Sequence, residues 1–335
     1  MLTEFAFTPS IFDEDAHEDK EAWRDQLREL NSSMFPRTSA WPIVVSDLYA
    51  GSWSSHILPY VERIQDHVAK KHCQGLLTNM ERMLVVRPDC RDWPNDNDVA
   101  WSREAVATHL IEPIDRIVSV VSTKQAMAGE FSLIRSIDEV MDAGFWQGIK
   151  SGASPRMMIS EQVILLRKLC LHSEWVAIIN AHGFGSEQDF SLQLLETAFR
   201  RPASFGPIHI ELHAEAPGVT DLVERNTRQE RVADSMARKI ERNLKSPHKA
   251  ELYFWPKLLD RVLVAGTFVK ESDGTIRKSP RWGGSMNHVA RGSEPNAPPT
   301  EWKLLRRESL NEWFSKFVAE DAAGKPAAVC TTPRK

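Results

Sequence analysis

The fold is decided by the segment Glu174-Trp175-Val176-Ala177-Ile178-Ile179-Asn180. An apolar run this nearly continuous is typical of a strand that is covered on both faces, as in a helix-flanked parallel sheet. Gly183 and Gly185 end the run, and Ser186 can cap a helix that follows it. The segment therefore predicts a strand followed by a helix, which is the repeating unit of an α/β fold.

The same alternation of strand and helix continues toward the C-terminus. Further strands are predicted at 208–212, 251–255, 261–268 and 302–306, and helices at about 186–199, 219–244 and 310–318. Residues 270–279 are expected to be a polar connection. The order βαβαββ…βα requires a sheet that is covered by helices. We therefore expect an α/β sheet domain over residues 171–320 and a flexible tail over 321–335.

The first 170 residues show a different pattern and are predicted to form a helix-rich region with few strands. Amphipathic helices are expected over 13–30 and 54–68 and over most of 99–171, with short strands at 41–45 and 82–86. We identify no catalytic motif in this region. Its role therefore stays open at the level of sequence.

Charge is distributed unevenly along the chain. Residues 1–220 contain 20 Lys and Arg against 31 Asp and Glu, whereas residues 221–335 contain 22 against 15. Only the C-terminal third is therefore able to attract a polyanion, and DNA or RNA is its expected partner. Acidic residues are interleaved with the basic ones, so an ordinary solvated surface is the alternative interpretation.

Composition also indicates the compartment. No apolar run approaches the roughly 20 residues that cross a bilayer, and the first 21 residues carry seven acidic residues and one Lys instead of a basic leader. The four cysteines lie far apart without a C-x-x-C pair, which argues against a zinc ribbon and a disulfide framework. We expect a cytoplasmic protein with reduced thiols, no cofactor and no membrane association.

Two short segments lie at strand positions that a known motif also uses. The first is Leu258-Leu259-Asp260-Arg261-Val262-Leu263-Val264, and the second is Trp282-Gly283-Gly284-Ser285-Met286-Asn287. They resemble the His-Asp-Arg variant of the His-x-Lys motif and the Gly-Ser-x-Asn segment of the phospholipase D-like superfamily. The resemblance covers roughly residues 170–320, which corresponds to one half of that family's paired active site.

The resemblance implies a phosphate site without covalent chemistry. In the family a His attacks phosphorus while Lys and Asn hold the phosphate oxygens. Here the position of the nucleophile is Leu259, which cannot attack, and the family's Asp would fall on Gly266. Arg261 can replace the Lys, because a guanidinium binds two oxygens in parallel. The implied phosphate-binding residues are Arg261, Ser285 and Asn287.

Other residues near the motif are candidates for neighbouring roles. His288 follows Asn287 directly and is the candidate catalytic residue that could replace the missing imidazole. Arg281, Trp282 and Arg291 are the candidate nucleic-acid contacts, with the ring of Trp282 available for base stacking.

One strand carries residues that could bind a metal. His209, Glu211 and His213 alternate along it and hence share one face, where two imidazoles could chelate an ion. The sequence shows no third ligand, so we predict no metal site.

Three functions fit these features. The first is a catalytically decayed phospholipase D-like module that binds nucleic acid or a partner protein in a bacterial multi-component system, such as a phage-defence operon; only the resemblance implies this setting. The second is an active phosphodiesterase or nuclease whose site is completed by a homodimer. The third is a protein-interaction scaffold, if Asp260 and Arg261 form only a structural ion pair. We prefer the first, because Leu259 argues against catalysis.

Overall fold

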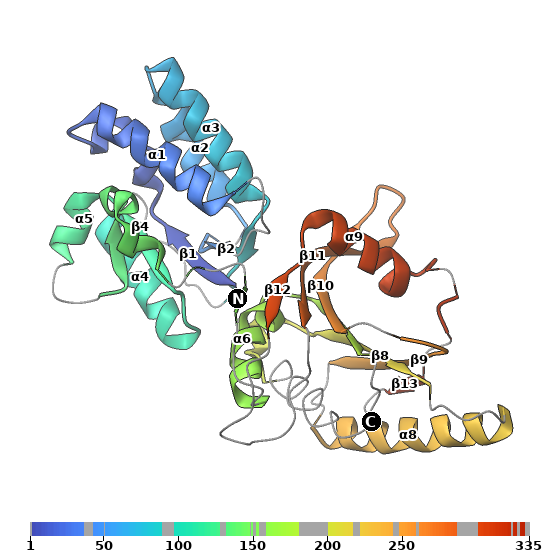
Figure 1. Cartoon of the computed structure of the whole chain (residues 1–335). Coiled ribbons are helices and arrows are strands. Elements are labelled where there is room, and N and C mark those ends of the chain that lie inside the picture. The colour runs from blue at the N-terminus through green and yellow to red at the C-terminus, as the bar shows by residue number, and fades with distance from the viewer. Residues whose placement is uncertain are drawn as a thin grey trace. The chain divides into compact units, whose positions relative to one another are not determined.

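The protein is described from a computed structural model of the whole chain (Figure 1). The structure describes residues 2–36, 43–49, 51–88, 97–127, 132–147, 149, 152–153, 159–180, 200–216, 222–243, 248–258, 261–286, 301–322, 324–326 and 329–331. Contacts within the chain divide it into an N-terminal unit, Leu2–Lys150, and a C-terminal unit, Ser151–Lys335.

The N-terminal unit is built on a five-stranded parallel sheet. Its strands are β1 (Thr3–Phe7), β2 (Ile43–Asp47), β3 (Leu84–Val86), β4 (Arg116–Ser119) and β5 (Ile134–Ser136). Their order across the sheet is β3-β2-β1-β4-β5, and every pair is parallel. Strands this apolar and this short fit a sheet with both faces covered, because helices exclude water from each side.

Helices cover both faces of this sheet. They are α1 (Lys20–Met34), α2 (Trp53–Arg63), α3 (His67–Glu81), α4 (Asp98–Ile111) and α5 (Val121–Ala126), with short turns η1 (Pro9–Phe12), η2 (Glu14–Ala16), η3 (Ile137–Met141) and η4 (Ala143–Trp146). Figure 1 shows α1 and α3 on one side of the strands and α4 on the other. Asp19, Asp66 and Asn97 cap three of the helices by accepting hydrogen bonds from backbone N–H groups of the first turn.

An ion pair is buried beneath this sheet's helices. Arg87 and Glu4 are both fully buried, and Arg87 Nη1 lies 2.8 Å from Glu4 Oε1. The hydroxyl of Ser46 donates to the same carboxylate oxygen at 2.6 Å, and Arg87 Nη2 donates to the carbonyl of Glu112 at 2.8 Å. Because Glu4 lies on β1 and Ser46 on β2, with Arg87 just after β3, the network links three adjacent strands.

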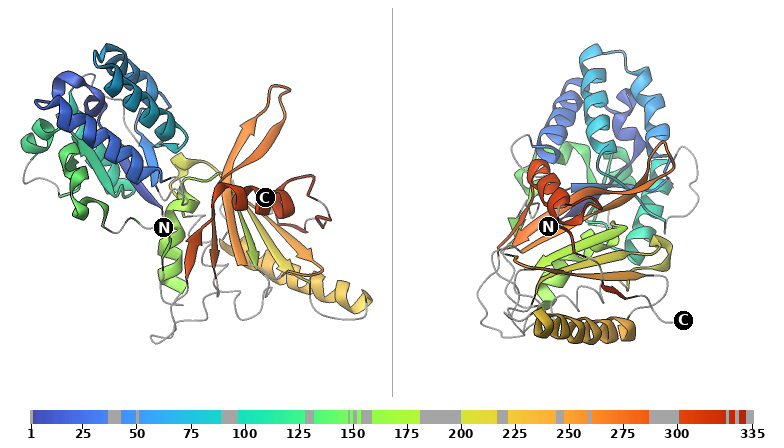
Figure 2. Two further views of the ribbon diagram at one scale, coloured as in Figure 1. Left: turned by 45° about the horizontal axis from the view of Figure 1, so that its top comes forward. Right: turned by 90° about the vertical axis from the view of Figure 1, so that its right-hand side faces the viewer.

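The C-terminal unit is built on an eight-stranded mixed sheet. Its strands are β6 (Gly152–Ala153), β7 (Trp175–Asn180), β8 (His209–Glu215), β9 (Lys249–Trp255), β10 (Arg261–Lys270), β11 (Ile276–Met286), β12 (Trp302–Leu304) and β13 (Val329–Thr331), in the order β13-β9-β8-β7-β10-β11-β12-β6. Strands β7, β8 and β9 are parallel, whereas β10 pairs antiparallel with β7. Strands β10 and β11 form a long hairpin that extends past the start of β7 (Figure 2).

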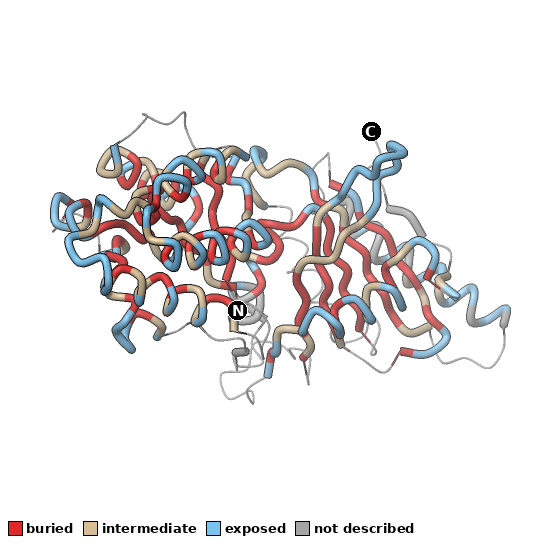
Figure 3. Tube along the Cα trace, turned by 90° about the horizontal axis from the view of Figure 1, so that it is seen from above, coloured by how far each residue is buried: buried red, intermediate tan, exposed pale blue. Residues whose placement is uncertain are grey.

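The helices of this unit are α6 (Ile159–Leu171), α8 (Leu222–Asn243) and α9 (Arg307–Trp313), with the turns η5 (Ala203–Phe205) and η6 (Phe314–Val318). Helices α8 and α9 lie on opposite sides of the sheet (Figure 1). Leu310, Phe317 and Val318 pack with Trp175 and Ile179 of β7 in one buried cluster. In the tube view, buried residues follow the strands of both sheets (Figure 3).

The α/β class predicted from the sequence is confirmed. The N-terminal region is helix-rich as expected, but its strands were underestimated, because 99–171 contains β4 and β5 and the region includes a complete parallel sheet. Residues 151–170 group with the C-terminal unit, which places the boundary near 150 instead of 170.

Two connecting segments also differ from expectation. Residues 270–279, expected to be a loop, are largely strand, since only 271–275 separate β10 from β11. The tail over 321–335 is not simply flexible: β13 pairs with β9, and Lys325 contacts the sheet domain. None of the described helices combines the length and the apolar character that a bilayer span requires.

Candidate functional site

Strands β8 and β9 run parallel and in register, so like positions lie side by side. His209, Glu211 and His213 alternate along β8, and Glu251 and Tyr253 stand next to Glu211 and His213 on β9. The rings of His213 and Tyr253 stack with centroids 4.7 Å apart. The sequence placed the three β8 residues on one face. The structure adds two β9 residues to the same cluster.

The Glu251 carboxylate is surrounded by hydrogen-bond donors. His209 Nε2 lies 2.9 Å from Oε2, Tyr253 Oη donates to the same oxygen at 2.9 Å, and Lys249 Nζ lies 2.5 Å from Oε1. The hydrogen bond from His209 is the main reason that the pKa of Glu251 lies well below its usual value. An ionised carboxylate only accepts, so His209 Nε2 carries a proton and Nδ1 is the ring nitrogen left to face a ligand.

Glu211 is a fully buried carboxylate held by two lysines. Lys278 forms an ion pair with Oε1, Lys325 Nζ lies 3.6 Å from Oε2, and His213 Nε2 lies 3.1 Å from Oε2. Burial alone would raise the pKa of Glu211. The hydrogen bond from His213 and the charge of Lys278 outweigh burial and lower this pKa to about 2. The carboxylate is therefore ionised inside the fold.

His213 is the neutral member of this cluster. Trp255 Nε1 donates to His213 Nδ1 at 2.9 Å, so that nitrogen carries no proton and Nε2 donates to Glu211. Burial lowers the pKa of His213, which agrees with a neutral ring. His213 therefore orients Glu211 and does not reach solvent, being 1% exposed.

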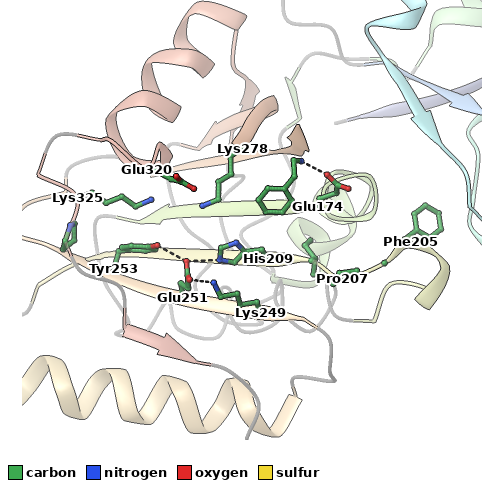
Figure 4. Close-up of a pocket in the computed structure, with 14 residues that line it drawn as sticks. Glu174, Phe205, Pro207, His209, Lys249, Glu251, Tyr253, Lys278, Glu320 and Lys325 are labelled. Atoms are coloured by element: carbon green, nitrogen blue, oxygen red, sulfur yellow. Dashed lines mark hydrogen bonds and ion pairs between the residues drawn. The ribbon is translucent and has the colours of Figure 1, made fainter. Parts of the chain in front are cut away.

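His209, Glu251 and Tyr253 border a pocket of about 810 Å³ (Figure 4). Its lining comes from β8, β9, β10, β11 and the segment after η6, and comprises Glu174, Phe205, Gly206, Pro207, Ile208, His209, Lys249, Glu251, Tyr253, Phe268, Lys278, Glu320, Lys325 and Pro326. Glu251 lines the pocket and pairs with Lys249, whereas Glu211 is fully buried behind the lining and pairs with Lys278 and Lys325.

Among the described residues, one group could hold a metal ion. Its donor atoms come from His209, Glu211 and Glu251 and lie within 4.8 Å of one another. Glu251 is thus the third ligand that the sequence did not reveal. The ammonium groups of Lys249 and Lys278 already neutralise these carboxylates, so a metal would have to displace them. The pairing of these carboxylates with lysines is therefore more typical of buried ion pairs than of a metal site.

Comparison with known proteins gives no guide to the function of this chain. The chain matches no known family model, and no curated protein is significantly similar to it. The evidence on function therefore comes from the residues of the pocket and from the segments 258–264 and 282–287.

The structure does not bring Arg261 and Ser285 together as a clamp. Arg261 pairs with Asn180 of β7, and Ser285 pairs with Val262. Because side chains alternate along a strand, Ser285 shares the face of Val262, whereas Arg261 projects to the other face. Arg261 and Ser285 stand on neighbouring strands at the same edge of the sheet but on opposite faces, which corrects the predicted arrangement.

Two predicted nucleic-acid contacts lie elsewhere on β11. Trp282 is only 3% exposed, so its expected role in base stacking was wrong. Arg281 packs over the Trp282 ring, with its guanidinium carbon 4.8 Å from the ring centroid, and burial lowers the pKa of Arg281. This pair therefore contributes to packing of the sheet. The remaining candidates, Asn287, His288 and Arg291, and Leu259 and Asp260 of the first motif segment, lie outside the described residues.

Gly266 has a steric reason to be glycine. A Cβ atom there would lie 1.9 Å from the carbonyl oxygen of Ser279 and 2.7 Å from the ring of Trp175. The register of β10 and β11 also shifts between Ala265 and Gly266. The position that matches the family's Asp has no room for a side chain.

Of the residues that line the pocket, sequence reasoning singled out only His209, and it missed the charged residues Glu251, Lys278 and Lys325. Glu251 could have been found, because the pattern Lys249-Ala250-Glu251-Leu252-Tyr253 alternates like that of β8 and predicts a neighbouring parallel strand. Lys278 and Lys325 gave no local signal. They reach Glu211 only through the β10–β11 hairpin and the chain after η6.

Proposed function

We propose that the C-terminal unit binds the phosphate groups of nucleic acid, and that the pocket along β8 and β9 is where a phosphate is held. Phosphate oxygens are recognised by ammonium groups and by imidazole or hydroxyl donors. Lys249, Lys278, Lys325, His209 and Tyr253 supply these groups around one pocket. The proposal places the site away from the edge where the sequence motif predicted it.

The observation that carries the proposal is the order of charge in the pocket. Glu211 is 0% exposed, whereas the side chains of Lys278 and Lys325, which pair with it, are 9% and 11% exposed. Glu211 thus lies beneath two of the bases. Each ammonium has three N–H donors, more than one carboxylate contact uses. Lys249, Lys278 and Lys325 therefore offer cationic donors to a ligand, beside the acids Glu174, Glu251 and Glu320 that also line the pocket.

Two features of the whole unit support the same ligand class. Residues 151–335 carry 27 Lys and Arg against 22 Asp and Glu, while residues 2–150 carry 15 against 24. The resemblance of 258–264 and 282–287 to phospholipase D-like segments also implies a phosphodiester ligand. The charge excess supports a polyanionic ligand directly, whereas the resemblance supports only the ligand class, because its own residues do not form the pocket.

The test replaces one cation of the pocket at a time. Lys249 is 47% exposed at the side chain, so Lys249→Gln removes a charge without opening the core. We expect this variant to bind a fluorescent single-stranded oligonucleotide roughly threefold to tenfold more weakly in an anisotropy titration. Lys303→Gln on β12, whose side chain is 67% exposed and paired with Glu301, is the matched control and should bind like the wild type. Equal loss in both variants, or no binding by the wild type, would overturn the proposal.

A second candidate, phosphodiester hydrolysis, is favoured by the hydrogen bond between Glu251 and His209. A carboxylate that fixes Nε2 leaves Nδ1 to take a proton from water, whose oxygen then attacks phosphorus while the leaving alkoxide departs with a proton from a lysine. Cleavage of bis(p-nitrophenyl) phosphate in EDTA, lost in His209→Gln, would establish it. An inactive wild type that still binds DNA or RNA would leave binding as the function.

A further inference from the structure

A second pocket lies in the N-terminal unit, at the carboxyl edge of its parallel sheet. Strand β1 has β2 on one side and β4 on the other, so the direction in which the chain adds strands reverses between β1 and β4. In open α/β sheets, ligands bind in the crevice outside the strand ends at such a reversal. This topology places a candidate ligand site among the residues that follow β1, β2 and β4.

A pocket of about 420 Å³ opens at this edge. Its lining includes Tyr49 after β2, His56, Tyr60 and Arg63 of α2, and Asp98 and Trp101 of α4. The volume lies within the range of small-molecule sites, about 300–1,000 Å³. Helices from two different crossover connections thus form its walls.

Aromatic rings supply much of this lining. The rings of Tyr49 and His56 stack with centroids 3.9 Å apart and planes 20° apart. His56, Tyr60 and Arg63 are spaced by four and three residues along α2, so they share one face of the helix over about two turns. The guanidinium of Arg63 lies 5.0 Å from the centroid of the Tyr60 ring. One face of each of these rings is thus occupied within the protein, so a flat ligand ring would stack on an opposite face.

Asp98 is the hydrogen-bond acceptor of the pocket. It is the first residue of α4, and Ser10 donates to its Oδ2, with further hydrogen bonds from Thr8 and Thr123. Thr8 follows β1 and Thr123 follows β4, so the carboxylate bridges the two strands at the reversal. Burial raises the pKa of Asp98 to about 6, and the nearby charge of Asp13 adds to the effect. A perturbed carboxyl group in a cleft is a marker of functional sites.

We propose that this pocket binds a nucleoside, either as a free nucleotide or as an unpaired base of a nucleic-acid strand. A base has the flat ring that the Tyr49, His56 and Tyr60 rings can stack on. It also has N–H donors along its edge, which the Asp98 carboxylate can accept. The side chain of Arg63 is exposed at the end of the face of α2 that also carries His56 and Tyr60. The phosphate of a bound nucleotide would extend out of the pocket toward this guanidinium.

The test is isothermal titration of the full chain with the four common nucleoside 5′-monophosphates and with a short single-stranded oligonucleotide. We expect at least one nucleotide to bind, and Asp98→Asn and Tyr60→Leu each to weaken binding roughly tenfold. Asp25→Asn, on the outer face of α1, is the control and should bind like the wild type. Binding of only the oligonucleotide, with the same loss in both variants, would identify a strand as the source of the base.

The pH dependence separates a role in binding from a role in folding. Asp98 faces Asp13 beside η1, His56 and Arg63 of α2, and the hydroxyls of Ser10 and Thr123. Protonation removes the ionised acceptor, so wild-type affinity should fall as pH drops through about 6. Asp98→Asn should bind weakly at every pH. No nucleotide and no oligonucleotide binding, or full affinity in Asp98→Asn, would overturn the inference.

Discussion

Glu4 and Glu211 are both carboxylates that no solvent reaches, and each is held by a different set of partners. Glu4 has one guanidinium, that of Arg87, and a hydroxyl from Ser46. Glu211 has two lysines and a neutral imidazole. An arginine holds its partner in a fixed planar geometry, whereas a lysine ammonium keeps donors that can turn to a ligand. This difference at the level of single residues is why the Glu211 cluster suits a site and the Glu4 pair suits a scaffold.

Acid should destabilise the C-terminal unit over two ranges of pH. The pKa of His213 lies below its ordinary 6.5, so the unfolded chain takes up this proton first and stability falls as pH drops below about 6.5. The pKa of Glu211 is about 2 in the fold against 4.5 ordinarily, so its stabilising charge is present above pH 4.5 and is lost toward pH 2. Thermal unfolding between pH 8 and pH 3 measures both effects.

The variant Glu211→Gln tests the lower pH range, between about 4.5 and 2, in which the charge of Glu211 is lost. At pH 7 it leaves Lys278 and Lys325 without their buried countercharge, which should cost about 3 kcal/mol or more of unfolding free energy. Below pH 4.5 the variant should lose less stability than the wild type. A variant as stable as the wild type at pH 7 would show that the lysines do not depend on Glu211.

Among the elements, the β10–β11 hairpin is constrained most tightly at Gly266. A methyl group there would meet the Ser279 carbonyl, so Gly266→Ala should push the two strands apart and cost about 1–3 kcal/mol. Gly75 in α3 is the control, because a Cβ there meets no atom within 4 Å and Gly75→Ala should stabilise by about 0.5–1 kcal/mol through helix propensity. Urea unfolding of both variants checks the opposite signs. Equal, small effects would mean that the hairpin adjusts without strain.

The same position excludes an acidic side chain. Gly266→Asp would add a larger side chain where even a Cβ atom has no room. The register shift of the hairpin between Ala265 and Gly266 lies at this crowded position.

Local pattern predicted the elements whose own sequence carries a strong periodic or apolar signal. Strands β7, β9 and β10 and helix α8 lie close to their predicted ranges, because each has a long apolar run or a clear helical stripe. Strand β4 was assigned to a helix, since Ile114, Ile117 and Val118 fit helical spacing as well as strand burial. Strands of three or four residues have too few positions to reveal their period.

The candidate site was predictable only where it is local to a strand. The shared face of His209, Glu211 and His213 follows from alternation along β8. The cations over Glu211 could not be foreseen, because Lys278 and Lys325 come from segments 67 and 114 positions away in sequence. Pairing register likewise decided that Arg261 and Ser285 face apart, and a one-residue change in register would have reversed that result.

On the scale of the whole molecule, charge divides along the same boundary as the contacts. The N-terminal unit is net acidic and the C-terminal unit is net basic, while the complete chain has a net charge of −4. Net charge therefore favours a polyanion at the C-terminal unit. The proposed binding of nucleic acid by the full chain would depend on local charge in that unit, so it should respond strongly to screening.

Oligonucleotide affinity of the full chain should fall steeply between about 50 and 200 mM salt, because each phosphate contact releases condensed counterions. The logarithm of the association constant should fall linearly with the logarithm of salt concentration. Lys249→Gln should reduce that slope by about one unit or less, with the same change for oligonucleotides of different sequence. Anisotropy titrations at four salt concentrations give the slopes for the wild type, Lys249→Gln and Lys303→Gln. A slope near zero would mean that phosphate contacts do not drive binding, and the C-terminal unit would then be better explained as a surface for a protein partner.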